Sequence, residues 1–390
     1  MRQQVERGCE MNRREFLRAA GVGACGVAGC MLASGGGRPG VLYGAETDAD
    51  HKQFYKEAMF YEKLPDKRTG CVLCPRKCVV QDGGRGYCRA RENVGGKYYT
   101  IVYGRVCTYH VDPIEKKPLF HFLPGTSAFS LATVGCNLEC KFCQNWEISQ
   151  ERPENLPATD MPPAKVVENT LQLKMPTIAY TYTEPTTFYE YMLDTARLGR
   201  QQNLKSVMIS AGYINPDPLA GLAPALDAIK IDLKGFTPDF YANVCGVTLR
   251  PVLDTIAMVK KSGTWLEVVH LVVPTLSDNE KEIDAMCKWM HDNVGDEVPL
   301  HFTRFYPMYK LANLPPTPVS SVERAREIAL ARGLKYVYVG NVPAQHPGES
   351  TYCPKCGKMV IERAGYTILS NRIHSGKCQY CHTPIAGVWS

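Results

Sequence analysis

Several features that would indicate a simple function class are missing from this sequence. It contains no internal repeat and no long low-complexity segment, so it is not a repeat array. Its net charge of +6 falls to +3 without residues 1–45, because that segment holds six arginines and three acidic residues. A charge this small does not indicate binding to nucleic acid. The apolar stretch over residues 19–33 is glycine-rich and too short for an ordinary transmembrane helix.

A fourth cysteine is also missing from the most informative segment, Gly135-Cys-Asn-Leu-Glu-Cys-Lys-Phe-Cys-Gln-Asn145. This loop carries Cys136, Cys140 and Cys143 with C-x3-C-x2-C spacing, and the next cysteine is Cys245. A [4Fe–4S] cluster normally takes four thiolates, so three thiolates leave one iron open to a ligand that is not protein. The alternatives are three unrelated buried cysteines or a zinc knuckle, but structural zinc takes four ligands. The spacing therefore favours a [4Fe–4S] cluster.

The residues around and after this loop predict an α/β scaffold. Apolar runs alternate with amphipathic helical segments, which is typical of a parallel sheet covered by helices. The runs are Phe129–Val134, Thr177–Tyr182, Ser206–Ser210, Ala228–Leu233, Leu266–Val273, Leu300–Phe305 and Tyr336–Val339. The helical segments include Ala164–Lys174, Thr187–Arg200, Leu253–Lys261, Glu280–Asn293 and Val322–Ala331. Repeated right-handed crossovers predict a full or partial (β/α) barrel, with its active site at the carboxyl ends of the strands.

The chain of 390 residues is long enough for one barrel with two small modules. We predict a signal and linker in residues 1–45 and a cysteine-rich module in 46–125. The barrel is predicted in residues 126–345 and a zinc-ribbon-like module in 346–390. Eleven of the seventeen cysteines fall into metal-ligand groups, which fits metal sites better than disulfides.

The cysteine spacing, with aromatic Phe142 before the last cysteine, is that of the radical SAM superfamily. There the open iron is chelated by S-adenosylmethionine (SAM). Over most of residues 68–390 the chain resembles the AmmeMemoRadiSam-type radical SAM proteins, a branch near the pyruvate formate-lyase activating enzymes. Besides the cysteine loop, the matching segments are Asp112-Pro-Ile-Glu-Lys-Lys-Pro118, Tyr180-Thr-Tyr-Thr-Glu-Pro185, Asp232-Leu-Lys-Gly235, Phe305-Tyr-Pro307 and Val339-Gly-Asn341. The resemblance implies the radical SAM barrel, with a [4Fe–4S] cluster and SAM as cofactors.

The resemblance also implies residues that bind SAM. Relatives carry a Gly-Gly-Glu-Pro-like turn after the second strand, which contacts the SAM amino group. Here Thr183-Glu184-Pro185 stands in its place, so Glu184 matches and the two glycines do not. Ser210 stands where relatives contact the ribose and carboxylate of SAM. The alternative for Glu184 is an ordinary acidic residue in the first turn of a helix, favoured by the helix dipole.

Two further pairs of residues are candidates at strand ends. Asp232 and Lys234 match an Asp-x-Lys pair that relatives place near SAM at the end of a middle strand. A simple surface ion pair is the alternative. His301 and Arg304 are candidates for contact with substrate or SAM by position alone, and a histidine in a strand is as often a hydrogen-bonded core residue.

Two CxxC pairs near the end of the chain form another metal-ligand group. Cys353 and Cys356 are separated from Cys378 and Cys381 by 21 residues, which is close to the spacing of a zinc ribbon. The two pairs supply the four thiolates of a closed tetrahedron. We therefore predict structural zinc, and a rubredoxin-like iron site with the same ligands remains the alternative.

A third group consists of Cys71, Cys74, Cys78 and Cys88, and the resembling family carries this cysteine-rich module too. Four thiolates within 18 residues could hold zinc or an auxiliary iron–sulfur cluster, and the sequence does not decide between them. Glycines in the connecting loop make it flexible enough to fold back. Apart from Cys30, the remaining cysteines are predicted to be ordinary thiols: Cys9, Cys25, Cys107, Cys245 and Cys287.

The N-terminus resembles an export signal. Asn12-Arg13-Arg14-Glu15-Phe16-Leu17-Arg18 is similar to a twin-arginine signal, and Val27-Ala-Gly-Cys30 is similar to a lipoprotein cleavage box. A chance basic and apolar start is the alternative, and Met11 is a second candidate for the first residue. Because SAM and low-potential reductants are made in the cytoplasm, we expect membrane attachment at the cytoplasmic face or an inefficient signal.

The resemblance implies reductive cleavage of SAM to methionine and a 5′-deoxyadenosyl radical, which abstracts hydrogen from a substrate. A low-potential donor of the flavodoxin or ferredoxin type is an expected partner, and the substrate, small molecule or protein, stays open. One alternative is activation of a glycyl-radical enzyme, although no cysteine of a ferredoxin-like insert lies between Cys143 and Glu184. A non-catalytic iron–sulfur and zinc scaffold is another, which the intact cysteines disfavour. An RNA-modifying enzyme is disfavoured by the low charge.

Overall fold

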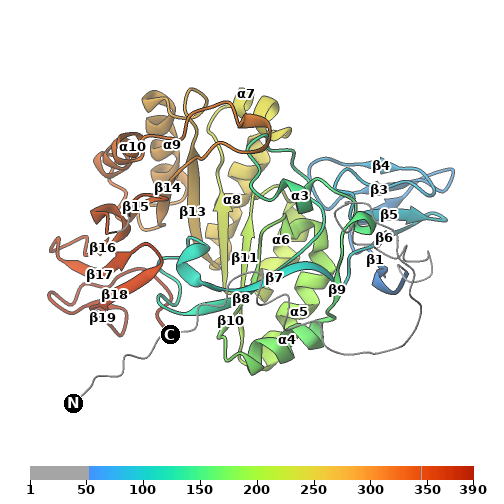
Figure 1. The fold of residues 1–390 in the computed structure, drawn as a ribbon, viewed down its shortest axis with the longest axis horizontal. Coiled ribbons are helices and arrows are strands. Elements are labelled where there is room, and N and C mark those ends of the chain that lie inside the picture. The colour runs from blue at the N-terminus through green and yellow to red at the C-terminus, as the bar shows by residue number, and fades with distance from the viewer. Residues whose placement is uncertain (1–51, 344) are drawn as a thin grey trace, which may run out of the picture. The chain divides into compact units, whose positions relative to one another are not determined.

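The computed structural model describes residues 52–343 and 345–390 (Figure 1). The twin-arginine-like signal, the lipoprotein-like box and Cys9, Cys25 and Cys30 lie outside these described residues. Within them, no single helix is both long and apolar enough to cross a bilayer. One bent pair of segments, Pro238–Cys245 and Arg250–Ser262, meets the length and composition criteria only when its two parts, at 106° to each other, are taken together.

A nine-stranded sheet forms the centre of the fold, in the order β15-β14-β13-β12-β11-β10-β8-β7-β9 (Figure 1). Its parallel strands are β8 (Ser127–Thr133), β10 (Thr177–Tyr180), β11 (Lys205–Ser210), β12 (Ala228–Asp232), β13 (Trp265–Val272), β14 (Leu300–Arg304) and β15 (Val337–Gly340). Two antiparallel strands, β7 (Arg105–Pro113) and β9 (Thr159–Asp160), extend the sheet beyond β8. The edge strands β15 and β9 do not pair with each other in the described part of the chain, so the sheet is open. The predicted parallel α/β sheet is confirmed, in an open form.

The parallel strands are covered on both sides, which explains their apolar sequences. All residues of β10 are buried, and so are all residues of β8 after Ser127. Each predicted apolar run coincides with one of these strands to within two residues at either end. In the central sheet, the strands that sequence analysis missed are β7 and β9. Both lie at one side of the sheet and have more exposed residues than the parallel strands.

Helices connect the strands and cover the sheet. The α-helices are α3 (Trp146–Ser149), α4 (Pro163–Gln172), α5 (Tyr189–Gln201), α6 (Pro216–Leu222), α7 (Pro238–Phe240), α8 (Arg250–Ser262), α9 (Glu280–Asn293) and α10 (Val319–Ala331). The short helices are η1 (Lys52–Phe54), η2 (Ile114–Lys116), η3 (Pro153–Asn155), η4 (Pro185–Phe188), η5 (Ala223–Ala225), η6 (Tyr241–Cys245), η7 (Tyr309–Leu311) and η8 (Pro347–Glu349). Local sequence sets their ends: the Asn279 side chain accepts the Lys281 N–H at 2.9 Å where α9 begins. Gly263, with φ of +82°, ends α8.

The N-terminal cysteine-rich module forms two small antiparallel sheets, with orders β2-β3-β4 and β1-β6-β5. Their strands are β1 (Lys56–Glu57), β2 (Tyr61–Lys63), β3 (Thr69–Cys71), β4 (Val79–Val80), β5 (Arg91–Val94) and β6 (Lys97–Thr100). The segment 46–125, predicted as one module, also contributes β7 to the central sheet. The module is joined to the covering helices by a buried ion pair between Arg91 of β5 and Glu190 of α5.

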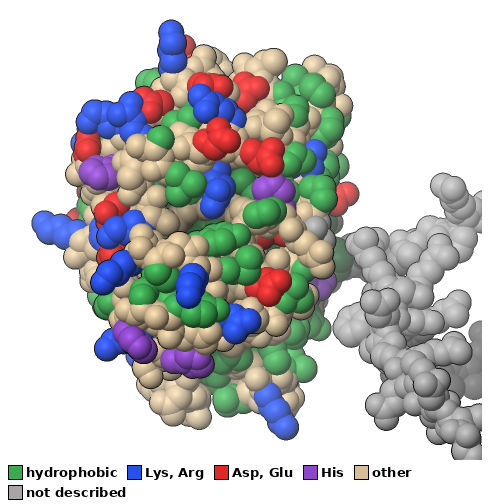
Figure 2. Space-filling model, turned by 90° about the vertical axis from the view of Figure 1, so that its left-hand side faces the viewer, with side chains coloured by type: hydrophobic (Ala, Val, Ile, Leu, Met, Phe, Trp, Pro, Cys, Tyr) green, Lys and Arg blue, Asp and Glu red, His purple; other side chains and the backbone are tan. Residues whose placement is uncertain are grey.

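The C-terminal module follows β15 and has sheet orders β16-β17-β18 and β19-β20. Its strands are β16 (Thr351–Tyr352), β17 (Met359–Ala364), β18 (Thr367–Asn371), β19 (Ile373–His374) and β20 (Lys377–Cys378). Val360 and Ile385 pack with Phe120, Tyr336 and Tyr338 in one buried cluster, which attaches the module to the main sheet. Figure 2 faces the side on which this module lies, where basic and acidic side chains are interspersed among hydrophobic patches.

Candidate active site

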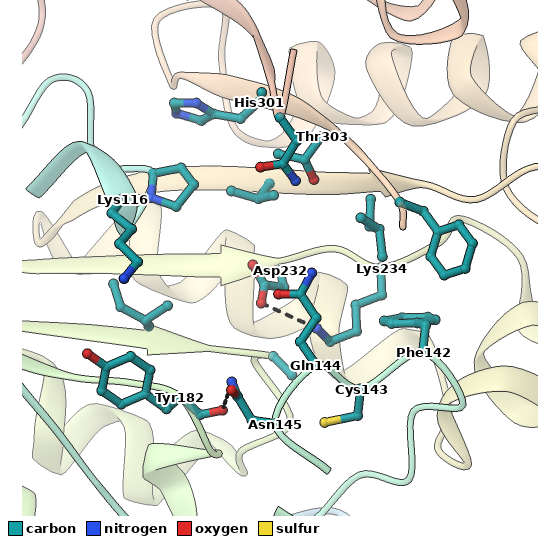
Figure 3. Close-up of a pocket in the computed structure, with 18 of the residues that line it drawn as sticks. Lys116, Phe142, Cys143, Gln144, Asn145, Tyr182, Asp232, Lys234, His301 and Thr303 are labelled. Carbon is teal, nitrogen blue, oxygen red and sulfur yellow. Dashed lines mark hydrogen bonds and ion pairs between the residues drawn. The ribbon is translucent and has the colours of Figure 1, made fainter. Parts of the chain in front are cut away.

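A cavity of about 390 Å³ opens at the carboxyl ends of the parallel strands. Its wall includes the cysteine loop after β8, the turn after β10 and the last residues of β11 and β12. Parallel strands present their carboxyl ends at one edge of a sheet, so side chains distant in sequence converge there. Figure 3 shows Cys143, Tyr182, Asp232 and His301 arranged around this space. The position agrees with that expected for a (β/α) active site.

The three cysteines of the loop, Cys136, Cys140 and Cys143, all line the cavity. Their sulfur atoms do not form a set within 4.8 Å of one another, unlike a second group of cysteines in the described residues. This open spacing fits a polynuclear cluster in which each iron takes one thiolate. Burial raises the pKa of Cys136 well above its usual value, so its thiolate form requires a partner such as a metal. The donors therefore fit a [4Fe–4S] cluster.

Close backbone packing holds the cysteine loop in place. Gly135 adopts φ of +111°, and a Cβ at this position would lie only 2.5 Å from the Cys88 carbonyl oxygen. The Glu139 N–H donates to the Cys245 carbonyl oxygen at 3.0 Å. Cys245, predicted to be an ordinary thiol, lies beside Cys140, and its hydrogen bond lowers the pKa of Cys140. No local pattern in the sequence indicated this contact, because more than 100 residues separate the two cysteines.

Glu184 and Ser210 meet at the next two strand ends, and both line the cavity. Ser210 donates from Oγ to Glu184 Oε1 at 2.7 Å, and the Ala211 N–H donates to Oε2 at 2.8 Å. Glu184 also caps η4, because it accepts the Thr186 N–H at 3.1 Å. Glu184 therefore acts at the start of a short helix, as the alternative interpretation expected. It also contacts Ser210, and the sequence had indicated these two residues independently of each other.

Asp232 and Lys234 lie together in the cavity wall, with Lys234 Nζ 3.3 Å from Asp232 Oδ2 (Figure 3). Sequence analysis missed Lys230, which is buried and also pairs with Asp232. Residues two apart on a strand share a face, so the period of β12 would have revealed this partner. Burial opposes a charged lysine, but Asp232 and Cys140 hold the pKa of Lys234 well above its usual value. Burial lowers the pKa of Lys230, so Lys234 is the lysine of this group that is held in its cationic form beside the cysteine loop.

His301 and Arg304 have different positions. His301 lines the cavity, yet its Nε2 contacts Glu267 Oε2 at 2.8 Å, and both side chains are buried. Burial lowers the pKa of His301. Glu267 also accepts the Phe120 N–H at 3.0 Å, so the pair fastens the chain that precedes β8. Arg304 donates from Nε to the Thr317 carbonyl oxygen at 2.6 Å and is not part of the cavity wall.

The segment Asp112–Pro118, singled out for its resemblance, contributes the wall opposite these strand ends. Lys116 Nζ lies 2.8 Å from Asp112 Oδ1, and the second oxygen of Asp112 accepts from Lys117 and from the Tyr182 hydroxyl. Lys116 and Tyr182 line the cavity (Figure 3). Although burial raises it, these three donors hold the pKa of Asp112 below its usual range. The motif thus fixes the cation of Lys116 and the phenol of Tyr182 in the cavity wall.

The two outer cysteine groups differ in spacing. Cys353, Cys356, Cys378 and Cys381 place their sulfur atoms within 4.8 Å of one another. Cys71, Cys74, Cys78 and Cys88 line a separate small cavity in the N-terminal module. The sulfur atoms of the C-terminal group therefore lie close together, whereas the N-terminal cysteines share the wall of one cavity.

Comparisons with known proteins agree with the site. The family profile of the radical SAM superfamily matches residues 130–290. An uncharacterised protein of Methanocaldococcus jannaschii is 48% identical over 328 residues, which are 84% of this chain and 97% of that protein. A putative glycyl-radical enzyme activating enzyme of the same organism is 23% identical over 205 residues, 52% of this chain and 76% of that protein. The pyruvate formate-lyase-activating enzyme of Clostridium pasteurianum is 22% identical over 158 residues, 38% of this chain and 63% of the enzyme.

The family profile spans the cysteine loop and the strands that carry Glu184, Ser210 and Asp232. The prediction made from the cysteine spacing is confirmed at this level. The chain belongs to the radical SAM superfamily.

Proposed function

We propose that this protein is an enzyme that cleaves SAM reductively and uses the resulting radical to abstract hydrogen from a substrate. The observation that carries the proposal is the convergence on one cavity of three openly spaced thiols, the Glu184–Ser210 pair and the Asp232–Lys234 pair. The superfamily implies a [4Fe–4S] cluster and SAM. A cluster held by the three cysteines would supply the electron for reductive cleavage of SAM.

Each group of residues has a role in this proposal. Cys136, Cys140 and Cys143 hold three irons and leave the fourth open. Glu184 accepts a hydrogen bond from the SAM ammonium group through Oε2, which among the described residues takes one hydrogen bond, from the Ala211 N–H at 2.8 Å. The Ser210 hydroxyl orients this carboxylate, and it accepts the Gly212 N–H at 2.9 Å, which fixes its own rotamer. The cationic Lys234 favours the anionic thiolates of the loop.

Metal analysis and electron paramagnetic resonance (EPR) test the binding step of this proposal. The full chain, reconstituted anaerobically with iron and sulfide, is reduced and measured with and without SAM. We expect a cluster signal that changes when SAM is added, because SAM occupies the open iron. A reduced cluster at Cys136, Cys140 and Cys143 whose signal is unchanged by saturating SAM would contradict the proposal.

Replacing Ser210 with alanine is expected to weaken SAM binding by about tenfold, because a hydrogen bond to a charged group is worth about 1.5 kcal/mol or more. The measurement is equilibrium binding of SAM to the cluster-loaded protein. Ser206→Ala is the matched control, since Ser206 is buried at the other end of the same strand and is not part of the cavity wall. Equal affinities in the two variants would show that Ser210 does not orient Glu184 toward SAM.

The substrate of the proposed enzyme remains to be found, and the cavity gives it limited space. The same cavity of about 390 Å³ is lined by the residues proposed to hold the cluster and SAM, so the space left for a substrate is smaller than this volume and fits a small molecule or a single side chain of a protein. The polar groups of Lys116, Tyr182 and Asn341 in its wall are available to orient such a substrate. Its electron donor is proposed to be a flavodoxin- or ferredoxin-type protein.

A glycyl-radical enzyme is the second candidate substrate, because two relatives are named as activating enzymes. Incubation of the reduced protein with SAM and a glycyl-radical enzyme encoded nearby would then produce a glycyl radical, detectable by EPR. The segment between Cys143 and Glu184 forms only α3, η3, β9, α4 and β10, so it contains no cysteine-bearing insert domain.

We also propose that the C-terminal cysteines hold structural zinc. Cys353 and Cys381 have sulfur atoms 3.5 Å apart and those of Cys356 and Cys378 are 3.8 Å apart, while tetrahedral zinc with bonds of 2.3 Å requires about 3.8 Å. Cys356→Ser is expected to release the zinc and make the C-terminal module sensitive to protease, since metal binding stabilises such small folds. Zinc content and limited proteolysis are the measurements, with Ser370→Ala in the same module as the control. Full zinc retention in the cysteine variant, or iron in this site in place of zinc, would contradict the assignment.

A further inference from the structure

The N-terminal cysteine group has a geometry that distinguishes between metals. Cys71, Cys74, Cys78 and Cys88 surround one small cavity. Among the described residues, the C-terminal group is the one set of cysteines whose sulfur atoms all lie within 4.8 Å of one another. No three of the N-terminal sulfurs are that close, although a zinc ion would draw them to about 3.8 Å. The sulfur atoms of the C-terminal group thus form a closed cage, and those of the N-terminal group form an open cage, called the second cage below.

Buried donors without partners lie in the wall of the open cage. Arg91 and Tyr98 line its cavity, and both are almost completely buried. The Arg91 Nε and the Tyr98 hydroxyl have no hydrogen-bond partner in the described protein. An unsatisfied buried donor costs about 1–3 kcal/mol. Iron–sulfur clusters accept hydrogen bonds at their sulfur atoms, so a cluster in this cavity would satisfy both donors.

We propose that Cys71, Cys74, Cys78 and Cys88 hold a second [4Fe–4S] cluster. The open spacing matches that of the Cys136–Cys143 loop, where the thiols also do not close on a single ion. Four thiolates complete the coordination of all four irons, so this cluster has no open position for SAM. Its chemistry is electron transfer, in contrast to the site at the strand ends.

The two cages share a wall. Arg76, between Cys74 and Cys78, donates from Nε to the Asn137 carbonyl oxygen at 2.5 Å and from Nη2 to the Gly246 carbonyl oxygen at 2.8 Å. Asn137 directly follows Cys136 in the sequence and itself lines the second cavity. On the other side, the Cys88 carbonyl oxygen packs against Gly135 so closely that only glycine fits. The loop that carries Cys136 is therefore built against the second cage.

From this contact we infer a path for electrons between the two clusters. The inference rests on the proposed function. A low-potential protein donor is oxidised by one electron, which enters the second cluster and passes to the cluster beside SAM. SAM is reduced by that electron, and its C5′–sulfur bond breaks into methionine and the 5′-deoxyadenosyl radical. Both clusters return to their starting oxidation states. Cys78 is half-buried and its neighbour Lys77 is exposed, so the N-terminal cysteine group reaches the surface at this point.

The assignment is tested by metal content and EPR of the full chain, prepared anaerobically with iron and sulfide and then with zinc as a competitor. We expect wild-type protein to hold two clusters, of which only one has an EPR signal that responds to SAM. Cys78→Ser and Cys88→Ser should each lose the EPR signal that is unchanged by SAM. Each variant should also lose about half of the bound iron and sulfide. Cys107→Ser, in β7 and outside every cysteine group, is the matched control.

The wild-type result alone decides the assignment if a variant fails to fold. One cluster per chain, or zinc retained by Cys71, Cys74, Cys78 and Cys88 in the presence of excess iron and sulfide, would overturn it. Failure of the proposed function would give a different result: the EPR signal of the cluster at Cys136, Cys140 and Cys143 would not change when SAM is added.

The electron path is tested by changing the reductant. In Cys78→Ser, 5′-deoxyadenosine formation driven by reduced flavodoxin is expected to fall by about tenfold or more, while formation driven by dithionite stays within about twofold of wild type. Dithionite is a small molecule, so we expect it to reduce the cluster at Cys136, Cys140 and Cys143 directly, with no electron passing through the second cluster. Equal rates with flavodoxin in variant and wild type would contradict the path, and so would equal losses with both reductants.

Discussion

Replacement of Cys140 by alanine is expected to reduce formation of 5′-deoxyadenosine to the background of the reductant alone. Two thiolates cannot replace three, because each iron other than the open one requires its own sulfur ligand. Cys140 is buried in the cavity wall, where no other cysteine of its loop can take its place. The assay quantifies 5′-deoxyadenosine after anaerobic incubation with SAM and dithionite.

Cys107→Ala is the control for this prediction, since Cys107 lies in β7 and donates only to the Ala132 carbonyl oxygen, at 3.4 Å. It should retain wild-type activity. Cys245→Ala is the informative second variant, because Cys245 lies beside Cys140 and is not predicted to be a ligand. Activity that survives in Cys140→Ala and disappears in Cys245→Ala would mean that the ligand set is wrong.

Replacement of Glu190 by alanine is expected to lower the free energy of unfolding by about 3–5 kcal/mol, the usual cost of removing one partner of a buried ion pair. Arg91 and Glu190 are each 1% exposed and are joined by two hydrogen bonds. Glu190 also accepts the Met59 N–H at 2.9 Å, so its loss removes a second contact to the N-terminal module. Urea unfolding followed by tryptophan fluorescence measures the effect.

Glu168→Ala is the matched control for this stability prediction. Glu168 pairs with Lys165 at 3.0 Å on the surface of α4, where both side chains are about half exposed. Surface pairs of this kind contribute at most a few tenths of a kcal/mol. A change in Glu190→Ala as small as that in Glu168→Ala would show that the N-terminal module is not fastened through Arg91. The double variant Arg91→Ala/Glu190→Ala should lose less than the sum of the single variants.

The sequence predicted the parallel part of the fold well because the physical signal there is strong. Strands buried on both faces must be apolar throughout, so each parallel strand of the central sheet was visible in the sequence to within two residues at either end. The antiparallel strand β7 was missed, since its sequence mixes Cys107, Tyr109 and His110 with apolar residues. Sheet closure could not be predicted either, because it depends on pairing between edge strands that leaves no periodic pattern.

The candidate site was predictable where spacing within one segment determines chemistry. This holds for the cysteine loop, whereas Glu184 and the Asp232–Lys234 pair were implied by the resemblance, and the fold brings all of them to one cavity. Contacts between distant segments were not predictable: the Ser210–Glu184 hydrogen bond, the Cys140–Cys245 contact and the Glu267 partner of His301 all required the fold. The metal that we propose for the N-terminal cysteines also rests on the fold, because zinc and a cluster use the same residue types at similar spacing and differ in the distances between sulfur atoms.

The measurement that tests the central claim most directly is product analysis of wild-type protein. The full chain, loaded with its cluster and shown to bind SAM, is reduced anaerobically, and methionine and 5′-deoxyadenosine are quantified together. The account predicts that both products form in equal amounts and only when reductant is present. A cluster-loaded, SAM-binding protein that forms neither product under strong reduction, or forms S-adenosylhomocysteine alone, would contradict it.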